Sequence, residues 1–508
     1  MEKSKPKVSF FFGAGAEVAY GMPSGGEFAL EIFRSISSKD KDQLKEQLAQ
    51  VETTSNQIAW FPDELGSQRV TVFGKTNFDS VISSTLEARR QDVVAAILNF
   101  DKYAERVVNE FAKLDQSVDI PRVLKVLGCE PGTKTFAQEI VLNNSLTGKN
   151  LDGLFGSDYF SAYMDIIRKG GFSESYSDNV TMLIRSLIEL LIGALGKELV
   201  NTLNSNIFKK APDDVALFDD IGGIFRLDFR RVGLDAFEHL LKEKPFNIRS
   251  QELIKNMSDN QYVAYQFLLR LYELIFSSVA DYQALVDSHF SYLYQPKKEW
   301  GKFCKITTFL FTVHRYMSEQ VEQCKKGQGY YEDIKNSNEL DIRAIATSNY
   351  TNFISRTGCS GIFHLNGKLS DWYDPYKNEI TDESNNVFKV PLLFTQSGTK
   401  PLTSISMSRR YIDYYDASKK SDVIIVIGYG FNADDGHINT LLRSLIDDED
   451  KKLVVLDYNC NDVGQRKKEI QRSLRCDKKN NIHVLNVDAE RLVDGKSWLG
   501  AVVGKMHE

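Results

Sequence analysis

Two stretches near opposite ends of the chain share one pattern, an apolar, β-rich run followed at once by a glycine turn and a polar helix start. Val8–Phe12 lead into Gly13–Ala16, and Val423–Ile427 lead into Gly428-Tyr429-Gly430. Runs without regular polar alternation are expected of strands whose two faces are both covered by helices. The pattern therefore predicts an α/β fold built on a parallel, doubly wound sheet.

The strand signals are not continuous along the chain. Further runs of strand character are residues 344–348, 361–365, 453–456 and 482–487. Between about residue 80 and residue 335 the apolar residues recur instead at helical spacing, as in Val180–Leu195. We therefore expect residues 1–35 to form the first part of the sheet domain and residues 336–508 the remainder. Residues 36–335 are then a mostly helical insertion or a second domain.

Composition narrows the class of protein. The chain has 63 Lys and Arg against 69 Asp and Glu, a net charge of −6, whereas a nucleic-acid-binding domain is expected to be basic. The closest two of its six cysteines, Cys460 and Cys476, are 16 positions apart, which excludes a paired-cysteine zinc ribbon. No apolar run reaches the length of about 18 residues that a membrane-spanning helix needs.

The N-terminus has some features of a secretory signal. Lys3, Lys5 and Lys7 precede an apolar run, but the uncharged stretch ends at Glu17 and contains two glycines. Together with the unpaired cysteines, this favours a location in a reducing cytoplasm.

The turn Gly13-Ala14-Gly15-Ala16 is the first candidate binding element. Small residues between a strand and a helix let backbone N–H groups approach an anion, and the helix N-terminus adds a favourable dipole. The turn lacks the third glycine of the usual dinucleotide fingerprint. A tight strand-to-helix turn without a ligand is the alternative interpretation.

Taken together, four stretches are more specific. They are Gly13–Ala16 with Gly21-Met22-Pro23-Ser24, then Thr347-Ser348-Asn349-Tyr350, then His364-Leu365-Asn366-Gly367, and then Gly428–Asn432 with Asp435. In these motifs and their order, the chain resembles the sirtuin-like family, especially its prokaryotic antiphage-defence branch, whose members hydrolyse NAD. The matches cover residues 1–35 and about 340–490, under half of the chain.

The resemblance implies a Rossmann-like sheet, split here by the helical insertion, that holds NAD at the C-terminal ends of its strands. It places Gly13, Ala14 and Gly15 against the pyrophosphate, and Pro23 and Ser24 over the nicotinamide. Ser348 and Asn349 are then near the nicotinamide ribose, where Asn349 helps to place the attacking group. Gly428 and Tyr429 line the phosphate and ribose side, and Asp457 or Asn459 takes the adenosine ribose. No metal is implied.

The chain departs from the family pattern at two positions. Family members usually carry His directly before the glycine of the third motif, where this chain has Asn366, and His364 stands two positions earlier. Residues two apart on a strand face the same side, so His364 could act as the general base or pack one residue deeper. Asn366 can only form hydrogen bonds. The family often has Asp two positions after the asparagine, where this chain has Thr351.

The remaining histidines indicate no metal site, because none has His or Cys at ligand spacing. His437 is interpreted as a helix-start residue, with a place at the edge of the site as the alternative. The apolar Leu190-Leu191-Ile192 suggests a helix buried on two sides, either in a domain core or in an oligomer interface.

Three hypotheses for function follow. The first is an antiphage NAD+ hydrolase that converts NAD+ to ADP-ribose and nicotinamide and depletes the cell once triggered. It would be a homo-oligomer with a defence-system partner or a phage-derived trigger, and without a membrane or nucleic-acid partner. The second is a catalytically degenerate sirtuin-like sensor or partner subunit that binds NAD or a related nucleotide. The third is a protein deacylase or ADP-ribosyltransferase.

Overall fold

The chain divides into two compact units. The computed structural model describes residues 5–23, 25–36, 38–114, 118–135, 151–206, 229–243, 256, 259–324, 327–383, 386–393, 404–458, 460 and 462–506. The unit that contains the sheet, called the sheet unit below, comprises residues 1–28, 35–74 and 282–508. The helical unit comprises residues 29–34 and 75–281. The domain limits expected at residues 35 and 335 stay a prediction.

A six-stranded parallel sheet forms the centre of the sheet unit. Its strands are β1 (Lys7–Phe12), β2 (Asp341–Thr347), β3 (Ile362–His364), β7 (Val423–Ile427), β8 (Lys452–Tyr458) and β9 (Ile482–Val487). Their spatial order is β3-β2-β1-β7-β8-β9, and every neighbouring pair is parallel. The predicted parallel α/β sheet is therefore confirmed.

The order of the strands reverses in the middle of the sheet. Counted in chain order within this sheet, the strands run 3-2-1-4-5-6, which is the order of the doubly wound Rossmann fold. β1 is the central strand and pairs with both β2 and β7, although most of the chain separates β1 from either of them. Its hydrophobic run Phe10–Phe12 is fully buried, as expected of a strand covered on both faces.

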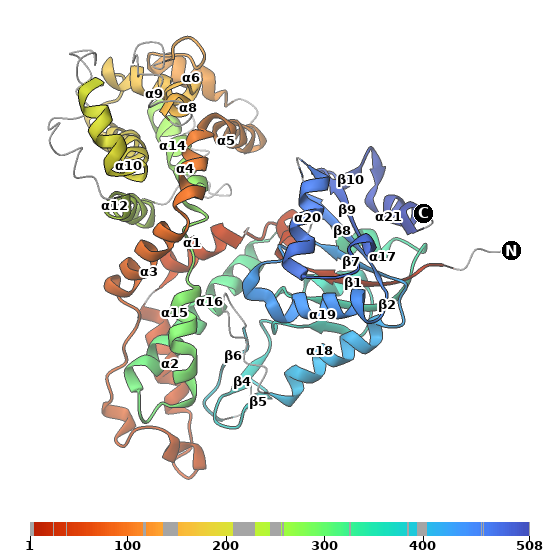
Figure 1. Cartoon of the computed structure of the whole chain (residues 1–508). Helices are drawn as coiled ribbons and strands as arrows, with labels where there is room; N and C mark the ends of the chain where they lie inside the picture. The colour runs from red at the N-terminus through yellow and green to blue at the C-terminus, as the bar shows by residue number, and fades with distance from the viewer. Residues whose placement is uncertain are drawn as a thin grey trace. The chain divides into compact units, whose positions relative to one another are not determined.

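Helices cover both faces of this sheet. Phe10 and Phe12 point to one face, where their rings contact Trp498 of α21 (Trp498–Met506) and Tyr331 of α17 (Tyr330–Lys335), respectively. On the opposite face Phe11 and Phe363 both share the register of Ala346, and the ring of Phe363 packs against Tyr414 of α18 (Ile405–Ser418). Figure 1 shows α18 beside the strands of this sheet.

The other helices of the sheet unit surround these layers. They are η1 (Ala14–Tyr20), α1 (Gly25–Ser35, shared with the helical unit), α2 (Ser38–Ala49), η2 (Asn56–Trp60), η3 (Leu65–Ser67), α15 (Gln283–His289), η5 (Phe290–Tyr294), α16 (Trp300–Gln323), η6 (Phe353–Thr357), α18 (Ile405–Ser418), η7 (Ala433–Asp435), α19 (Gly436–Asp447), α20 (Val463–Leu474) and η8 (Lys479–Asn481). A small antiparallel sheet joins β5 (Glu379–Thr381), β4 (Trp372–Asp374) and β6 (Val390–Pro391), and β10 (Leu492–Val493) pairs with β11 (Lys496–Ser497).

The described part of the helical unit consists of α-helices around an apolar core. They are α3 (Lys75–Ala88), α4 (Arg90–Leu98), α5 (Phe100–Leu114), α6 (Ile120–Leu127), α8 (Leu151–Phe155), α9 (Asp158–Arg168), α10 (Glu174–Asn206), α12 (Phe229–Lys242) and α14 (Asn260–Phe276). The stripe predicted at helical spacing on α10 is buried from Val180 to Leu191. α14 begins at Asp259, whose side chain accepts hydrogen bonds from the next turn. Within the described ranges, no helix is long and apolar enough to cross a membrane.

Candidate active site

The candidate site lies at the carboxyl edge of the six-stranded sheet, where β1 and β7 end side by side. After β1 the chain adds β2 and β3 on one side of this pair, and after β7 it adds β8 and β9 on the other side. In open α/β sheets, ligands bind outside the carboxyl ends of the strands at such a reversal. Two of the four predicted motifs directly follow β1 and β7, and the other two begin at Thr347 and His364, the last residues of β2 and β3.

The two glycine turns form one tight junction. The Gly13 amide donates to the Ile427 carbonyl at 2.9 Å, and the Gly15 amide donates to the Gly428 carbonyl at 2.8 Å. Gly428 has a φ of +67°, and a Cβ added there would lie 2.1 Å from the Ala16 nitrogen. Only glycine fits this approach. Because Gly13 and Gly15 use their amides to hold β7, the exposed Ala14 is the residue of this turn placed to offer its amide to an anion.

The structure brings Asn349 to this junction. Its side-chain Nδ2 donates to the Gly13 carbonyl at 3.0 Å, and its backbone amide donates to Thr347 Oγ1 at 2.9 Å. The preceding residue, Ser348, donates its amide to the Phe12 carbonyl at 3.0 Å. Asn349 is 7% exposed, so its amide group is fixed by the end of β1 rather than by solvent.

His364 lies beside Asn349. It ends β3, and its Nδ1 is 3.3 Å from the backbone oxygen of Asn349. Burial lowers the pKa of His364 below its usual value of 6.5, although this hydrogen bond raises it. The ring is therefore neutral near pH 7. With its proton on Nδ1 toward Asn349, the ring has Nε2 as a proton acceptor.

Asn366 belongs to a separate set of contacts. We expected strand geometry to place His364 and Asn366 on one side, but β3 ends at His364 and Asn366 lies in the following turn. Asn366 is 5% exposed, and its Oδ1 lies 3.2 Å from His437 Nε2 and 3.4 Å from the Tyr411 hydroxyl. His437, in the first turn of α19, is thus at the site and in contact with a predicted site residue. The sequence predicted a helix-start residue with a place at the edge of the site as the alternative, and the structure shows both, because His437 lies in the first turn of α19 and contacts Asn366.

Glu17 is a site residue that sequence reasoning missed. It lies on η1, directly after the glycine turn, and is 2% exposed. Its Oε1 accepts hydrogen bonds from Thr351 Oγ1 at 2.8 Å and from the Tyr331 hydroxyl at 3.0 Å. Burial raises the pKa of Glu17 to about 7, while these hydrogen bonds lower it. The signal in the sequence is a lone acid among small and apolar residues after a buried strand.

Tyr429 is buried behind the site. Its ring contacts Phe11 edge-on at 5.0 Å between centroids, and its hydroxyl donates to Asn439 Oδ1 of α19 at 2.9 Å. Its side chain therefore packs between the sheet and α19. Tyr429 can line the predicted phosphate and ribose side only through its backbone, beside Gly428.

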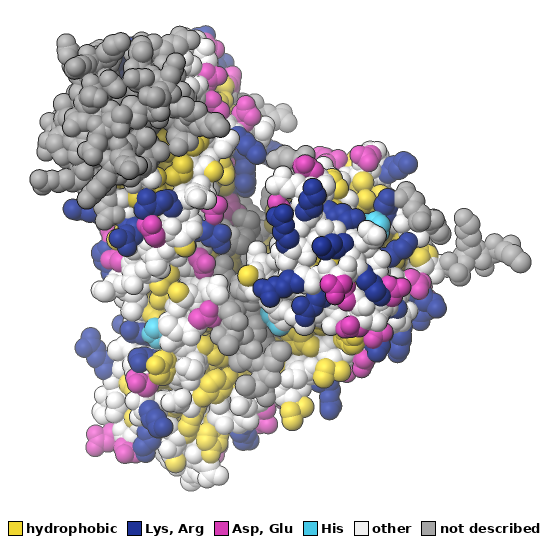
Figure 2. Space-filling view, in the orientation of Figure 1, with side chains coloured by type: hydrophobic (Ala, Val, Ile, Leu, Met, Phe, Trp, Pro, Cys, Tyr) yellow, Lys and Arg dark blue, Asp and Glu magenta, His cyan; other side chains and the backbone are white. Residues whose placement is uncertain are grey.

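The residues predicted to hold the two ends of the nucleotide make fewer contacts with the rest of the candidate site. Asp457, near the end of β8, accepts a hydrogen bond from Arg466 Nε of α20 at 3.1 Å. α20 also carries Lys467, Lys468 and Arg472. Figure 2 shows Lys and Arg side chains in dark blue over this part of the sheet unit. Pro23 is half-buried after η1. Ser24 and Asn459 lie outside the described residues.

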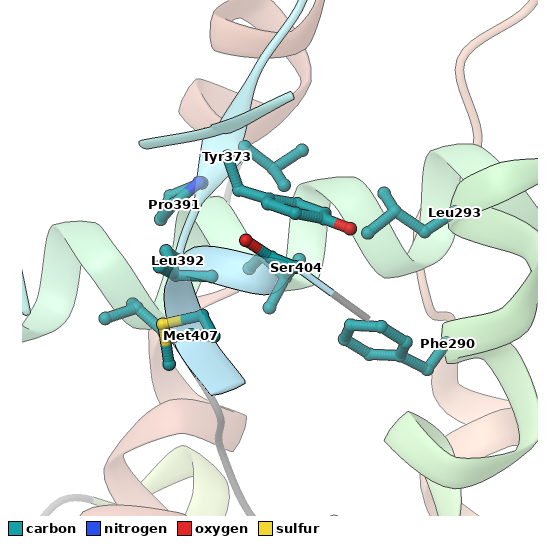
Figure 3. A pocket seen from close by; sticks show the side chains of 10 residues that line it. Phe290, Leu293, Tyr373, Pro391, Leu392, Ser404 and Met407 are labelled. Atoms are coloured by element: carbon teal, nitrogen blue, oxygen red, sulfur yellow. The ribbon is translucent and has the colours of Figure 1, made fainter. Parts of the chain in front are cut away.

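Two hollows of the sheet unit lie apart from this group. One is apolar, is lined by Phe290, Tyr373, Met407 and their neighbours, and measures about 10 Å³, close to the minimum for one water molecule (Figure 3). The other is an open depression of about 570 Å³ between the end of α17 and the β10–β11 hairpin, with Glu339, Glu490 and Ser497 in its wall. Neither contains a predicted site residue.

Within the ranges that the structure describes, no three His, Cys, Asp or Glu side chains are grouped to hold a metal ion. The six cysteines are free thiols, and three of them are buried.

The chain was compared with models of protein families, with curated proteins and with solved structures, and none of the three comparisons gave a match.

Proposed function

We propose that this protein is an NAD+ hydrolase that cleaves NAD+ to ADP-ribose and nicotinamide. The observation that carries the proposal is the position of Asn349. Its side chain is bonded to Gly13 at the reversal point of a 3-2-1-4-5-6 sheet, and His364 is bonded to its backbone. The strand order and the glycine junction support a dinucleotide at this edge, and a polar amide beside a neutral imidazole suits water-dependent cleavage.

In this reaction the protein acts mainly by orienting the reacting groups. Water attacks the anomeric carbon of the nicotinamide ribose, the C–N bond breaks, and its electron pair leaves with nicotinamide. The transition state resembles an oxocarbenium ion, as in glycoside hydrolysis. In our proposal Asn349 orients the ribose and the water, and His364 accepts a proton through Nε2. Both contribute by placing groups before the reaction begins.

The rest of the nucleotide would extend along the edge toward β8. We assign the pyrophosphate to the exposed amide of Ala14 and the backbone around Gly428, and the adenosine ribose to Asp457. Pro23 and Ser24 belong to the nicotinamide end.

The biological role follows from the resemblance to defence NADases. We propose a cytoplasmic effector whose basal turnover of NAD+ is raised by a phage-derived trigger or a defence partner until NAD+ is depleted. The helical region between β1 and β2 is then an insertion into the sheet domain that senses the trigger or joins copies of the chain. A toxic hydrolase needs such control until infection.

A second candidate function is a nucleotide-binding sensor or partner subunit without turnover. Asn366 favours it, because an amide stands where the family has a histidine, and its Oδ1 is held by contacts to His437 and Tyr411. In this case the edge of the sheet binds NAD without cleaving it.

The deciding experiment measures nicotinamide release and NAD binding on the same samples. We expect wild-type protein to release nicotinamide, and Asn349→Ala to lose at least about 100-fold in kcat, the scale of lost positioning. His364→Ala should lose a similar factor if it is the base. Tyr415→Phe, on the outer part of α18, is the matched control and should keep full activity. Binding without release in the wild type would favour the sensor, and absence of binding would refute both functions.

A further inference from the structure

Glu17 joins three segments that meet at the site. It comes from η1, Tyr331 comes from α17, and Thr351 follows β2. Both hydroxyl groups donate to the same carboxylate oxygen, at 3.0 Å and 2.8 Å. An ionised carboxylate that is 2% exposed is costly, and hydrogen bonds offset this cost only in part. A neutral side chain would accept the same two hydrogen bonds at lower cost, so the acid calls for an explanation beyond packing.

Glu17 reaches Asn349 by two routes, of which the first is a direct hydrogen bond between their side chains. The Tyr331 hydroxyl that donates to Glu17 also lies 3.5 Å from Asn349 Nδ2, and the same Nδ2 donates to the Gly13 carbonyl. Acceptors on Gly13 and Tyr331, the latter held by Glu17, therefore fix the position of Nδ2 in the Asn349 side chain. The orientation of its carbonyl end follows from that position.

We propose that Glu17 is a positioning residue for the cleavage of NAD+, and that its ionised form sets the orientation of Asn349 both directly and through Tyr331. This inference rests on the proposed function. As a carboxylate, Glu17 accepts a hydrogen bond from the Tyr331 hydroxyl, which leaves the phenolic oxygen free to accept a hydrogen bond from Asn349 Nδ2. A protonated Glu17 is itself a hydrogen-bond donor. It competes with Asn349 for the phenolic oxygen of Tyr331, and the Asn349 side chain is then held less firmly. Thr351 holds the carboxylate in place.

This arrangement makes activity depend on pH. Burial raises the pKa of Glu17 to about 7, so activity should rise as the pH passes through that value. Protonation of His364 should cause a second loss of activity at lower pH, because burial lowers the pKa of this side chain from 6.5. The titratable and charged groups that face Glu17 and its hydroxyl partners are Tyr20, Tyr331, Glu332, Arg356 and, through Asn349, His364.

The experiment compares the full-length wild type with Glu17→Gln, which keeps the shape of the side chain and its acceptor oxygen. We expect Glu17→Gln to bind NAD within about threefold of the wild type, to lose at least tenfold in kcat at pH 8, and to lack the limb near pH 7. Asp374→Asn is the matched control. It replaces another buried acid of the sheet unit, on β4 of the small antiparallel sheet, whose pKa is also raised by burial, and it should leave kcat and the pH profile unchanged.

A double-mutant cycle tests the route through Asn349. If Glu17 acts through Asn349, adding Glu17→Gln to Asn349→Ala should cost nothing more. Additive losses, or a Glu17→Gln variant with the wild-type kcat and pH profile, would overturn the inference and leave the proposed function intact. Absence of nicotinamide release from the wild type would overturn both. Glu17→Asp, which keeps the charge, should recover part of the rate, and failure to do so would mean that packing alone explains the position.

Discussion

At the scale of single residues, the site depends on polar groups that are buried beside apolar ones. Glu17 and Asn349 are both below one tenth exposed, and both contact Tyr331, whose ring packs on the fully buried Phe12 at the end of β1. A buried acid with a raised pKa and specific partners at a strand end is typical of functional sites. Such a group also affects stability, which provides a test that does not depend on activity.

We predict that Glu17→Gln stabilises the protein at alkaline pH. The pKa of Glu17 is raised from 4.5 to about 7 by folding, so the wild type loses stability as the pH rises through this interval. The glutamine variant should match the wild type at pH 4.5 and exceed it by as much as ~3 kcal/mol at pH 8. Urea unfolding at both pH values measures the difference. A variant that is less stable than the wild type at pH 8 would contradict the prediction.

At the scale of elements, the glycine junction holds the ends of β1 and β7 together. Gly13, Gly15 and Gly428 approach so closely that side chains are excluded, and two backbone hydrogen bonds cross the junction. These two hydrogen bonds occupy the Gly13 and Gly15 amides, which the sequence pattern predicts to bind a phosphate. The junction is thus as much a structural element as a binding one.

Gly428→Ala should be strongly destabilising. The new Cβ would meet the Ala16 nitrogen at 2.1 Å and would sit on a residue with φ of +67°, so the backbone must shift. We expect a loss of ~3 kcal/mol or more in unfolding free energy, with loss of NAD binding. Gly495→Ala is the control, because Gly495 has φ of +75° with nothing within 4 Å. It should cost only ~1 kcal/mol. Equal losses at both positions would show that the junction is not tight.

At the scale of the whole molecule, the tryptophans report on one unit. All four, at residues 60, 300, 372 and 498, lie in the sheet unit and none lies in the helical unit. Intrinsic tryptophan fluorescence therefore follows the unfolding of the unit that carries the candidate site.

We predict that NAD raises the thermal midpoint seen by tryptophan fluorescence. A ligand that binds only the folded state at 100 times its Kd adds about 2.7 kcal/mol of stability. The shift should vanish in Gly428→Ala and persist in Asn349→Ala if Asn349 serves the reaction more than binding. An unchanged midpoint at saturating NAD in the wild type would argue against nucleotide binding at this edge.

Local sequence determined the elements and the residues at their ends. Apolar β-rich runs such as Phe10–Phe12 and Val423–Ile427 are strands because their composition suits a sheet covered on both faces. Asn349 and His364 were predicted from the motif resemblance, and they lie at the ends of β2 and β3, two further strands that the sequence indicated. The periodicity of α10 likewise predicted its buried stripe. These features depend on neighbours a few residues away, which a sequence displays directly.

Only the tertiary structure decided which ends meet. Glu17, His437 and Tyr331 became site residues because β1 inserts between β2 and β7, and because α17 and α19 pack on opposite faces of the sheet. The commitment of the Gly13 and Gly15 amides to β7 arises in the same way. Pairings of this kind depend on burial and hydrogen bonding between segments hundreds of residues apart, and no local pattern in the chain encodes them.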